Sequence, residues 1–158
     1  MTGAAKGIIA ILLVAVGVLA FMLWRGQPAT EPVGGSNPLD QREALLLNPE
    51  QHHHILEEMR GLLTAVALIQ QARTSDDWAA IAEAAKGQGT KRGQIPPAGM
   101  RQAQPPAFRQ MGQGMRGQFD AMADAAEAKN GEAVDTALTA ALGACMGCHE
   151  TYRVQLAR

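Results

Sequence analysis

Apolar residues along the chain fall into one unbroken run and four later segments with helical spacing. The run extends from Gly7 to Trp24 and contains no charged residue. A helix of that length measures about 27 Å, close to the thickness of a bilayer's hydrocarbon core. We therefore expect residues 1–25 to form a single transmembrane anchor. A cleaved signal peptide is the alternative, although such peptides usually carry a shorter apolar region of about 7–15 residues.

The segment that follows the apolar run has no periodic pattern. Residues 26–48 contain prolines and glycines that interrupt regular structure, among them Pro28, Pro32 and Gly34. This composition predicts a flexible linker. Within it, only residues 41–47 suggest a helical turn.

The four later segments predict amphipathic helices, because their apolar residues recur every three or four positions. The first begins with a capping arrangement of Asn48, Pro49 and Gln51 and runs to about Arg73. Ser75 is expected to cap a second, shorter helix.

The third and fourth helices follow a long connection over residues 87–104. Pro105 and Pro106 open the third helix, and Asn130 with Gly131 ends it. The apolar stripe of the fourth helix comprises Val134, Leu138, Ala141, Leu142, Cys145, Cys148, His149 and Tyr152. Nothing alternates with period two, so we expect an all-α fold in which residues 49–158 form an antiparallel four-helix bundle.

Composition and charge narrow the function classes. The formal net charge is −1, so no strong attraction to nucleic acid is expected. Aromatic residues make up only 4% of the chain, and a large apolar cofactor would supply buried surface that such a core lacks. Between Ala84 and Phe119 there are six basic residues and no acidic one. An ordinary solvated loop explains this stretch, but cofactor carboxylates, an acidic redox partner or anionic lipid would also suit it.

The only two cysteines carry the most specific signal. Cys145 and Cys148 stand three positions apart, with His149 directly after them. On a helix these positions share one face, and the spacing is that of a c-type haem attachment site. A disulfide would leave His149 unexplained, and a structural zinc site would need four ligands. We therefore expect one haem c, bound covalently through both thiols and axially through the imidazole.

The continuation of this motif, Cys-Met-Gly-Cys-His-Glu-Thr-Tyr-Arg over residues 145–153, resembles class II c-type cytochromes, the cytochrome c-prime family. Weaker similarities lie around Phe108 on the third helix and Met59 on the first. The resemblance covers roughly residues 48–158. It implies a left-handed four-helix bundle with His149 as the proximal iron ligand. It also implies that Arg153, one helical turn after His149, lies beside the haem.

The resemblance does not decide what occupies the sixth coordination position of the iron, because the family has two kinds of member. High-spin members have an apolar distal residue and bind small gases, whereas low-spin members use a methionine of the first helix. Met59 begins Met-Arg-x-x-Leu-x-Ala, which resembles the low-spin pattern, and we expect it to be the distal ligand. A core-filling role is the alternative. His52 lies two turns earlier on the same face, and Met111 and Met115 are expected to be core residues.

These features together predict an electron carrier rather than an enzyme. We expect it to be anchored in the bacterial inner membrane by its N-terminal helix, with the haem domain in the periplasm and redox proteins as partners. Binding of nitric oxide or carbon monoxide by five-coordinate iron is the alternative function. A peroxidase-like site would need a distal acid–base residue, and the sequence places none there. The sequence does not decide whether two bundles pair as a homodimer.

Overall fold

The computed structural model describes residues 16–19, 21 and 39–157. The predicted anchor and linker therefore lie largely outside the described residues. Among the helices that the structure does describe, none is long and apolar enough to cross a membrane. A compact unit begins at Leu39. This unit includes residues 39–48, which we had assigned to the linker.

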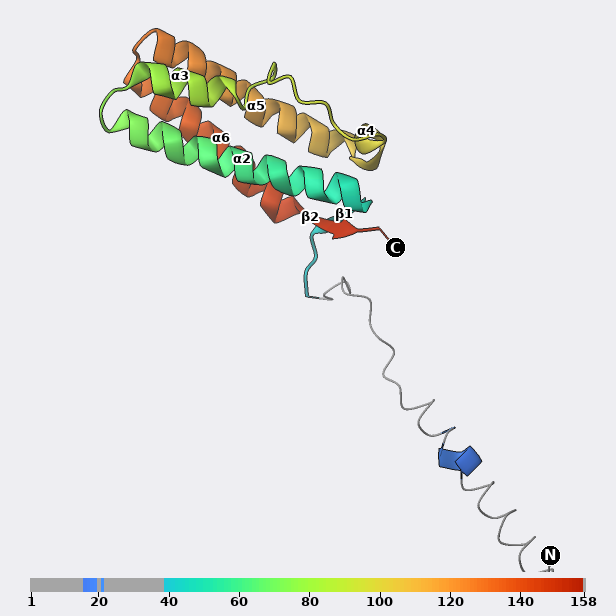
Figure 1. Ribbon diagram of the computed structural model, residues 1–158. Helices are drawn as coiled ribbons and strands as arrows, with labels where there is room; N and C mark the ends of the chain where they lie inside the picture. The colour runs from blue at the N-terminus through green and yellow to red at the C-terminus, as the bar shows by residue number, and fades with distance from the viewer. Residues whose placement is uncertain (1–15, 20, 22–38, 158) are drawn as a thin grey trace, which may run out of the picture. The chain divides into compact units, whose positions relative to one another are not determined.

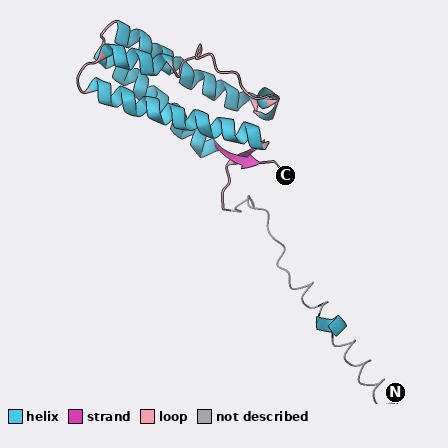
Figure 2. Ribbon diagram, viewed as in Figure 1, coloured by secondary structure: helices cyan, strands magenta, loops and turns pink. Residues whose placement is uncertain are grey.

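Helices make up most of this unit, as predicted (Figures 1 and 2). Four of them run side by side: α2 (Pro49–Arg73), α3 (Trp78–Lys86), α5 (Pro106–Glu127) and α6 (Gly131–Thr151). The long connection between α3 and α5 contains one further short helix, α4 (Met100–Ala103). Two short strands, β1 (Glu43–Leu47) and β2 (Tyr152–Leu156), complete the unit.

Local sequence signals explain where the helices begin. The predicted capping box of α2 is confirmed: the Asn48 side chain accepts a hydrogen bond from the Gln51 backbone, and the Gln51 side chain accepts one from the Asn48 backbone. The cap predicted for the next helix is wrong. Asp77, not Ser75, accepts the hydrogen bond from Ala80 and begins α3, while Ser75 donates to the carbonyl of Ala72 in the preceding turn.

The two strands are the main departure from the predicted fold. β1 and β2 pair in parallel, with Glu43 opposite Tyr152 and Leu47 opposite Leu156. The helical turn predicted for residues 41–47 is therefore wrong. Tyr152 is also not on the stripe of α6, because its backbone is extended (φ −121°, ψ 150°) and ends the helix.

The buried side chains form two clusters at different positions along α2. The larger surrounds α3 and the facing parts of α5 and α6, and its fully buried members include Ile69, Ile81, Met122 and Val134. We call this region the α3 end. The smaller cluster gathers Leu45, Leu47, Ile55, Met100 and Tyr152 around the start of α2 and the two strands. We call this region the motif end, because the Cys145–His149 motif of α6 borders it.

Candidate haem-binding site

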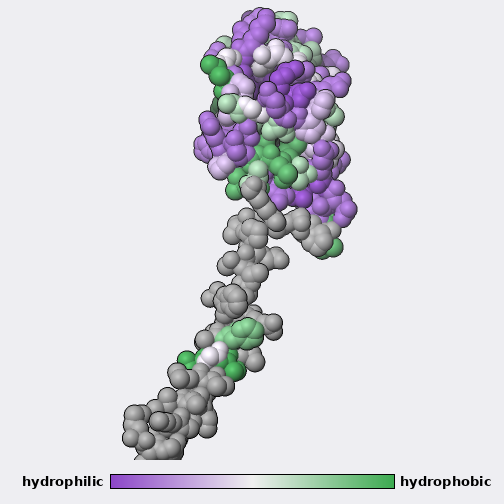
Figure 3. Space-filling model, turned by 90° about the vertical axis from the view of Figure 1, so that its right-hand side faces the viewer, coloured by the Kyte–Doolittle hydropathy of each residue, from purple (hydrophilic) through white to green (hydrophobic). Residues whose placement is uncertain are grey.

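The motif end contains a cavity of about 320 Å³ between α2, α4, α5 and α6. Cys145, Cys148 and His149 line it from α6, and Met59 lines it from α2. Four of the five predicted site residues are therefore brought to one cavity. Figure 3 views the molecule from the side on which α4 lies in Figure 1, and apolar side chains gather there with hydrophilic ones around them.

The two cysteines are free thiols, so they do not form the disulfide that the sequence left open. Both are partly buried, and burial raises the pKa of the Cys145 and Cys148 thiols. The neighbouring Cys145 raises the pKa of Cys148 further. Thiols three positions apart on one helical face suit thioether bonds to a flat macrocycle, and His149 lies on the same face.

Met59 is partly buried and packs against both hydrophobic clusters. Two other methionines, Met111 and Met115, line the cavity from α5. Met115 is 8% exposed and belongs to the larger cluster, which confirms it as a core residue. His52 is not among the lining residues, whereas His54 is.

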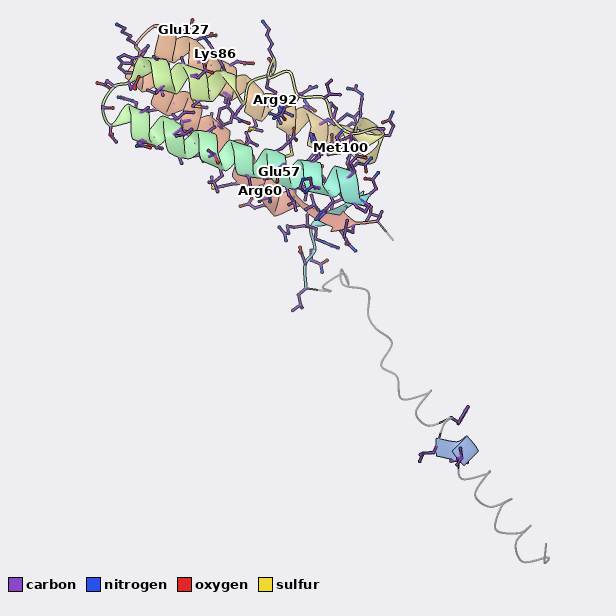
Figure 4. The ribbon with its side chains drawn as sticks, in the orientation of Figure 1. Glu57, Arg60, Lys86, Arg92, Met100 and Glu127 are labelled. Carbon is purple, nitrogen blue, oxygen red and sulfur yellow. The ribbon has the colours of Figure 1, made fainter. Side chains whose placement is uncertain are left out.

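An ionic cluster that the sequence did not reveal borders the same cavity. Glu58 of α2 is paired with Arg92 of the connection and with Arg116 of α5, whose Nη2 lies 3.3 Å from Glu58 Oε1. His54 Nε2 lies 3.5 Å from the same carboxylate oxygen. Arg92 is labelled in Figure 4 on the connection between α3 and α4. Only the basic character of residues 84–119 hinted at this cluster.

The cluster has more positive than negative charge. Two guanidinium groups share one carboxylate, and burial lowers the pKa of Arg116. Arg92 Nη1 is buried without a hydrogen-bond partner among the described residues. A spare guanidinium donor beside a cavity suits a carboxylate, and haem carries two propionates. The lining therefore fits a haem with three kinds of group: the two thiols, an imidazole and an unsatisfied arginine donor, which stand around an apolar wall.

Arg153 is not among the residues that line the cavity, and the helical position expected for it is wrong. We expected it one helical turn after His149, but α6 ends at Thr151 and Arg153 lies in β2. Its Nε donates to the carbonyl of Arg42 at 3.3 Å and lies 3.8 Å from Asp40 Oδ2. It therefore ties β2 to the segment before β1.

Arg42 is a further contact to the motif that sequence reasoning missed. Its Nη1 donates to the backbone carbonyl of His149 at 3.1 Å, across 107 positions of sequence. No local pattern could have revealed it, since Arg42 stands among residues that read as linker.

Comparison with known proteins agrees with this geometry. The family model described as Cytochrome C' matches residues 37–153, well over half of the chain. The match includes β1, all the helices from α2 to α6 and the Cys145–His149 motif. No curated protein and no solved structure matches the chain. The chain therefore belongs to the cytochrome c-prime family, the haem-binding class II c-type cytochromes.

Proposed function

We propose that this protein is a membrane-tethered periplasmic electron carrier. In this proposal one haem c is bound covalently through Cys145 and Cys148 in an antiparallel four-helix bundle, and His149 and Met59 are the axial ligands. One observation carries the proposal: Met59 of α2 lines the same cavity as the complete Cys145–His149 motif of α6. The apolar run of residues 7–24 supports the tether.

Haem iron supplies reversible one-electron chemistry, and the protein sets its potential through the axial ligands and surroundings. Met59 offers a neutral, soft thioether, which favours reduced iron and raises the potential. His149 offers an imidazole from a helix that also carries both tethering thiols. The apolar wall, which includes Ile55 and Leu62, would limit the access of water to the iron.

The arginines suit two tasks in an electron carrier. Arg92, held in place by Glu58, has a spare donor for a propionate carboxylate. Arg101 and Arg109 also line the cavity, and with Arg92 they make its polar border basic. A basic border would orient an acidic redox partner toward the haem and speed association at low ionic strength.

The ligand assignment is tested by optical spectroscopy of the full chain matured with haem. Wild-type protein should give a low-spin spectrum, with the weak long-wavelength charge-transfer band of methionine-ligated ferric haem. Met59→Leu keeps an apolar side chain of similar volume but removes the sulfur, so it should abolish that band and give a high-spin spectrum. Met111→Leu, on the opposing helix α5, should keep the low-spin spectrum.

The same experiment separates carrying electrons from binding gas. A wild-type spectrum that is high-spin and shifts on addition of carbon monoxide would replace the electron-carrier proposal with gas binding. If Met111→Leu loses the band and Met59→Leu keeps it, the distal ligand is Met111 of α5 and not Met59. The tether is tested separately. Replacing residues 1–25 with a cleavable signal peptide should release the haem protein from the membrane fraction.

A further inference from the structure

The last turn of α6 carries the proximal ligand but has little helix beyond it. His149 stands two residues before the final helical residue, Thr151. The last carbonyl groups of a helix lack partners within the helix and must find them elsewhere. The Tyr152 amide donates to the carbonyl of Cys148, but Tyr152 is already extended. The carbonyl of His149 therefore needs a partner from another part of the chain.

Arg42 provides that partner. Its Nη1 lies 3.1 Å from the His149 carbonyl oxygen. Asp40 holds the guanidinium in place through two contacts, Nε to Oδ1 at 2.9 Å and Nη2 to Oδ2 at 2.8 Å. This pairing with Arg42 lowers the pKa of Asp40 to about 2. A cation beside the C-terminus of a helix is also favoured by the helix dipole.

Pairing of β1 with β2 also restrains the last turn of α6. β1 follows Arg42 directly, and its Leu45 and Leu47 are 1% and 0% exposed. They belong to the cluster that packs against Cys148. β2 follows the last turn of α6 directly and pairs with β1 along all five residues of each strand. The end of α6 is therefore held by an arginine cap and by pairing with a strand that carries two buried leucines.

We propose that residues 40–47 form a proximal clasp, in which Arg42 is a positioning residue that fixes the orientation of His149. The clasp lies outside the helices that run side by side, and it acts on the iron ligand through the backbone of α6. The inference rests on the proposed function only in taking His149 as an axial ligand. It assigns a role to residues that we had placed in the linker, so the chain that enters the fold is coupled to the proximal side of the haem.

The test compares the full-length haem protein with Arg42→Ala, Arg42→Lys and Asp40→Asn. Hydrogen exchange at the Tyr152 amide reports the last turn directly, because this amide donates to Cys148. We expect exchange about tenfold faster in Arg42→Ala, the factor that one hydrogen bond of modest strength supports. Electron paramagnetic resonance of the oxidised haem should broaden, because His149 samples more orientations, and the midpoint potential should fall with the loss of a nearby positive charge.

The other variants separate positioning from charge. Arg42→Lys keeps the charge and a donor but loses the paired contacts to Asp40, so it should restore most of the wild-type exchange rate and line width. Asp40→Asn should resemble Arg42→Ala more weakly in exchange rate and line width, but it should raise the potential, because it removes a negative charge. Lys86→Ala is the charge control: it removes an exposed cation paired with Glu127, and both are labelled in Figure 4 well away from Met100 at the motif end. It should change none of the three measurements.

Two results would overturn the inference. Wild-type exchange and line width in Arg42→Ala would show that the cap does not position His149, even if the potential moves. Equal potentials in Arg42→Lys and Arg42→Ala, with unchanged line widths, would do the same. Failure of the proposed function looks different, because the wild-type protein would then show no low-spin haem spectrum at all.

Discussion

The two ends of the helical unit are built from similar side chains but packed differently. At the α3 end, Ile69, Ile81 and Met122 are fully buried against one another. At the motif end, Met59, Phe108 and Cys148 are only partly buried and border a cavity. The α3 end is therefore stabilised by its own side chains. We infer that the motif end gains a large part of its buried apolar contacts from the haem.

The largest expected effect is loss of the covalent cofactor. In a double variant, Cys145→Ser with Cys148→Ser, no haem should remain attached after denaturation, because both thioether bonds are gone. Hydrogen exchange should then rise strongly at the motif end and change little at the α3 end. A uniform rise along α2, from Ile55 to Ile69, would contradict the division into two ends.

A matched pair of phenylalanines on α5 tests the same division energetically. Phe119 is 1% exposed at the α3 end, so Phe119→Ala should lower the free energy of unfolding by about 3–5 kcal/mol. Phe108 lines the cavity and meets the Tyr152 ring edge-on at 5.2 Å. Phe108→Ala should cost less, about 1–2 kcal/mol, because Phe108 is only partly buried. Chemical denaturation of both haem proteins measures the difference, and equal losses would contradict it.

Neighbouring glutamates on α2 test the ionic cluster of the motif end. Glu58→Gln leaves the charges of Arg92 and Arg116 without a carboxylate, so it should lower the free energy of unfolding by about 1–3 kcal/mol. It should also raise the midpoint potential, because a negative charge beside the cavity is lost. Glu57→Gln is the control, since the Glu57–Arg60 pair is exposed and labelled in Figure 4. If potentiometry finds equal shifts of the midpoint potential in both variants, Glu58 does not act on the haem site.

The smallest effect concerns acid pH. The pKa of Asp40 is lowered from 3.8 to about 2 in the folded protein by its hydrogen bonds with Arg42. The folded state therefore binds this proton less readily than the unfolded chain, and the stabilisation is present above about pH 4 and is lost as the pH falls toward 2. The melting temperature of Asp40→Asn should lie slightly below that of wild type at pH 6, and the gap should close near pH 2. If the difference in melting temperature persists at pH 2, it does not come from the titration of Asp40.

Sequence reasoning found the features that local chemistry determines. The capping box at Asn48 and the cysteine and histidine spacing need only neighbouring residues, and both lie where they were predicted. The strand β1 was missed because Ala44 to Leu47 are all apolar and show no alternation. Its buried positions, Leu45 and Leu47, belong to a cluster with Met100 and Tyr152, which are distant in sequence. Arg42 and Glu58 were missed for the same reason, since their partners come from other segments.

The pairing of β1 with β2 also has a consequence for the order of folding. β1 lies near the start of the unit and β2 more than a hundred residues later, so the ladder cannot form until β2 has been made. Contacts between such distant segments carry a loop-closure cost and tend to form late. We therefore expect a maturing chain to pass through a stage in which the helices exist but the end of α6 is still unpaired. We expect Cys145 and Cys148 to be accessible in that interval for the proposed haem attachment, and the clasp to close afterwards.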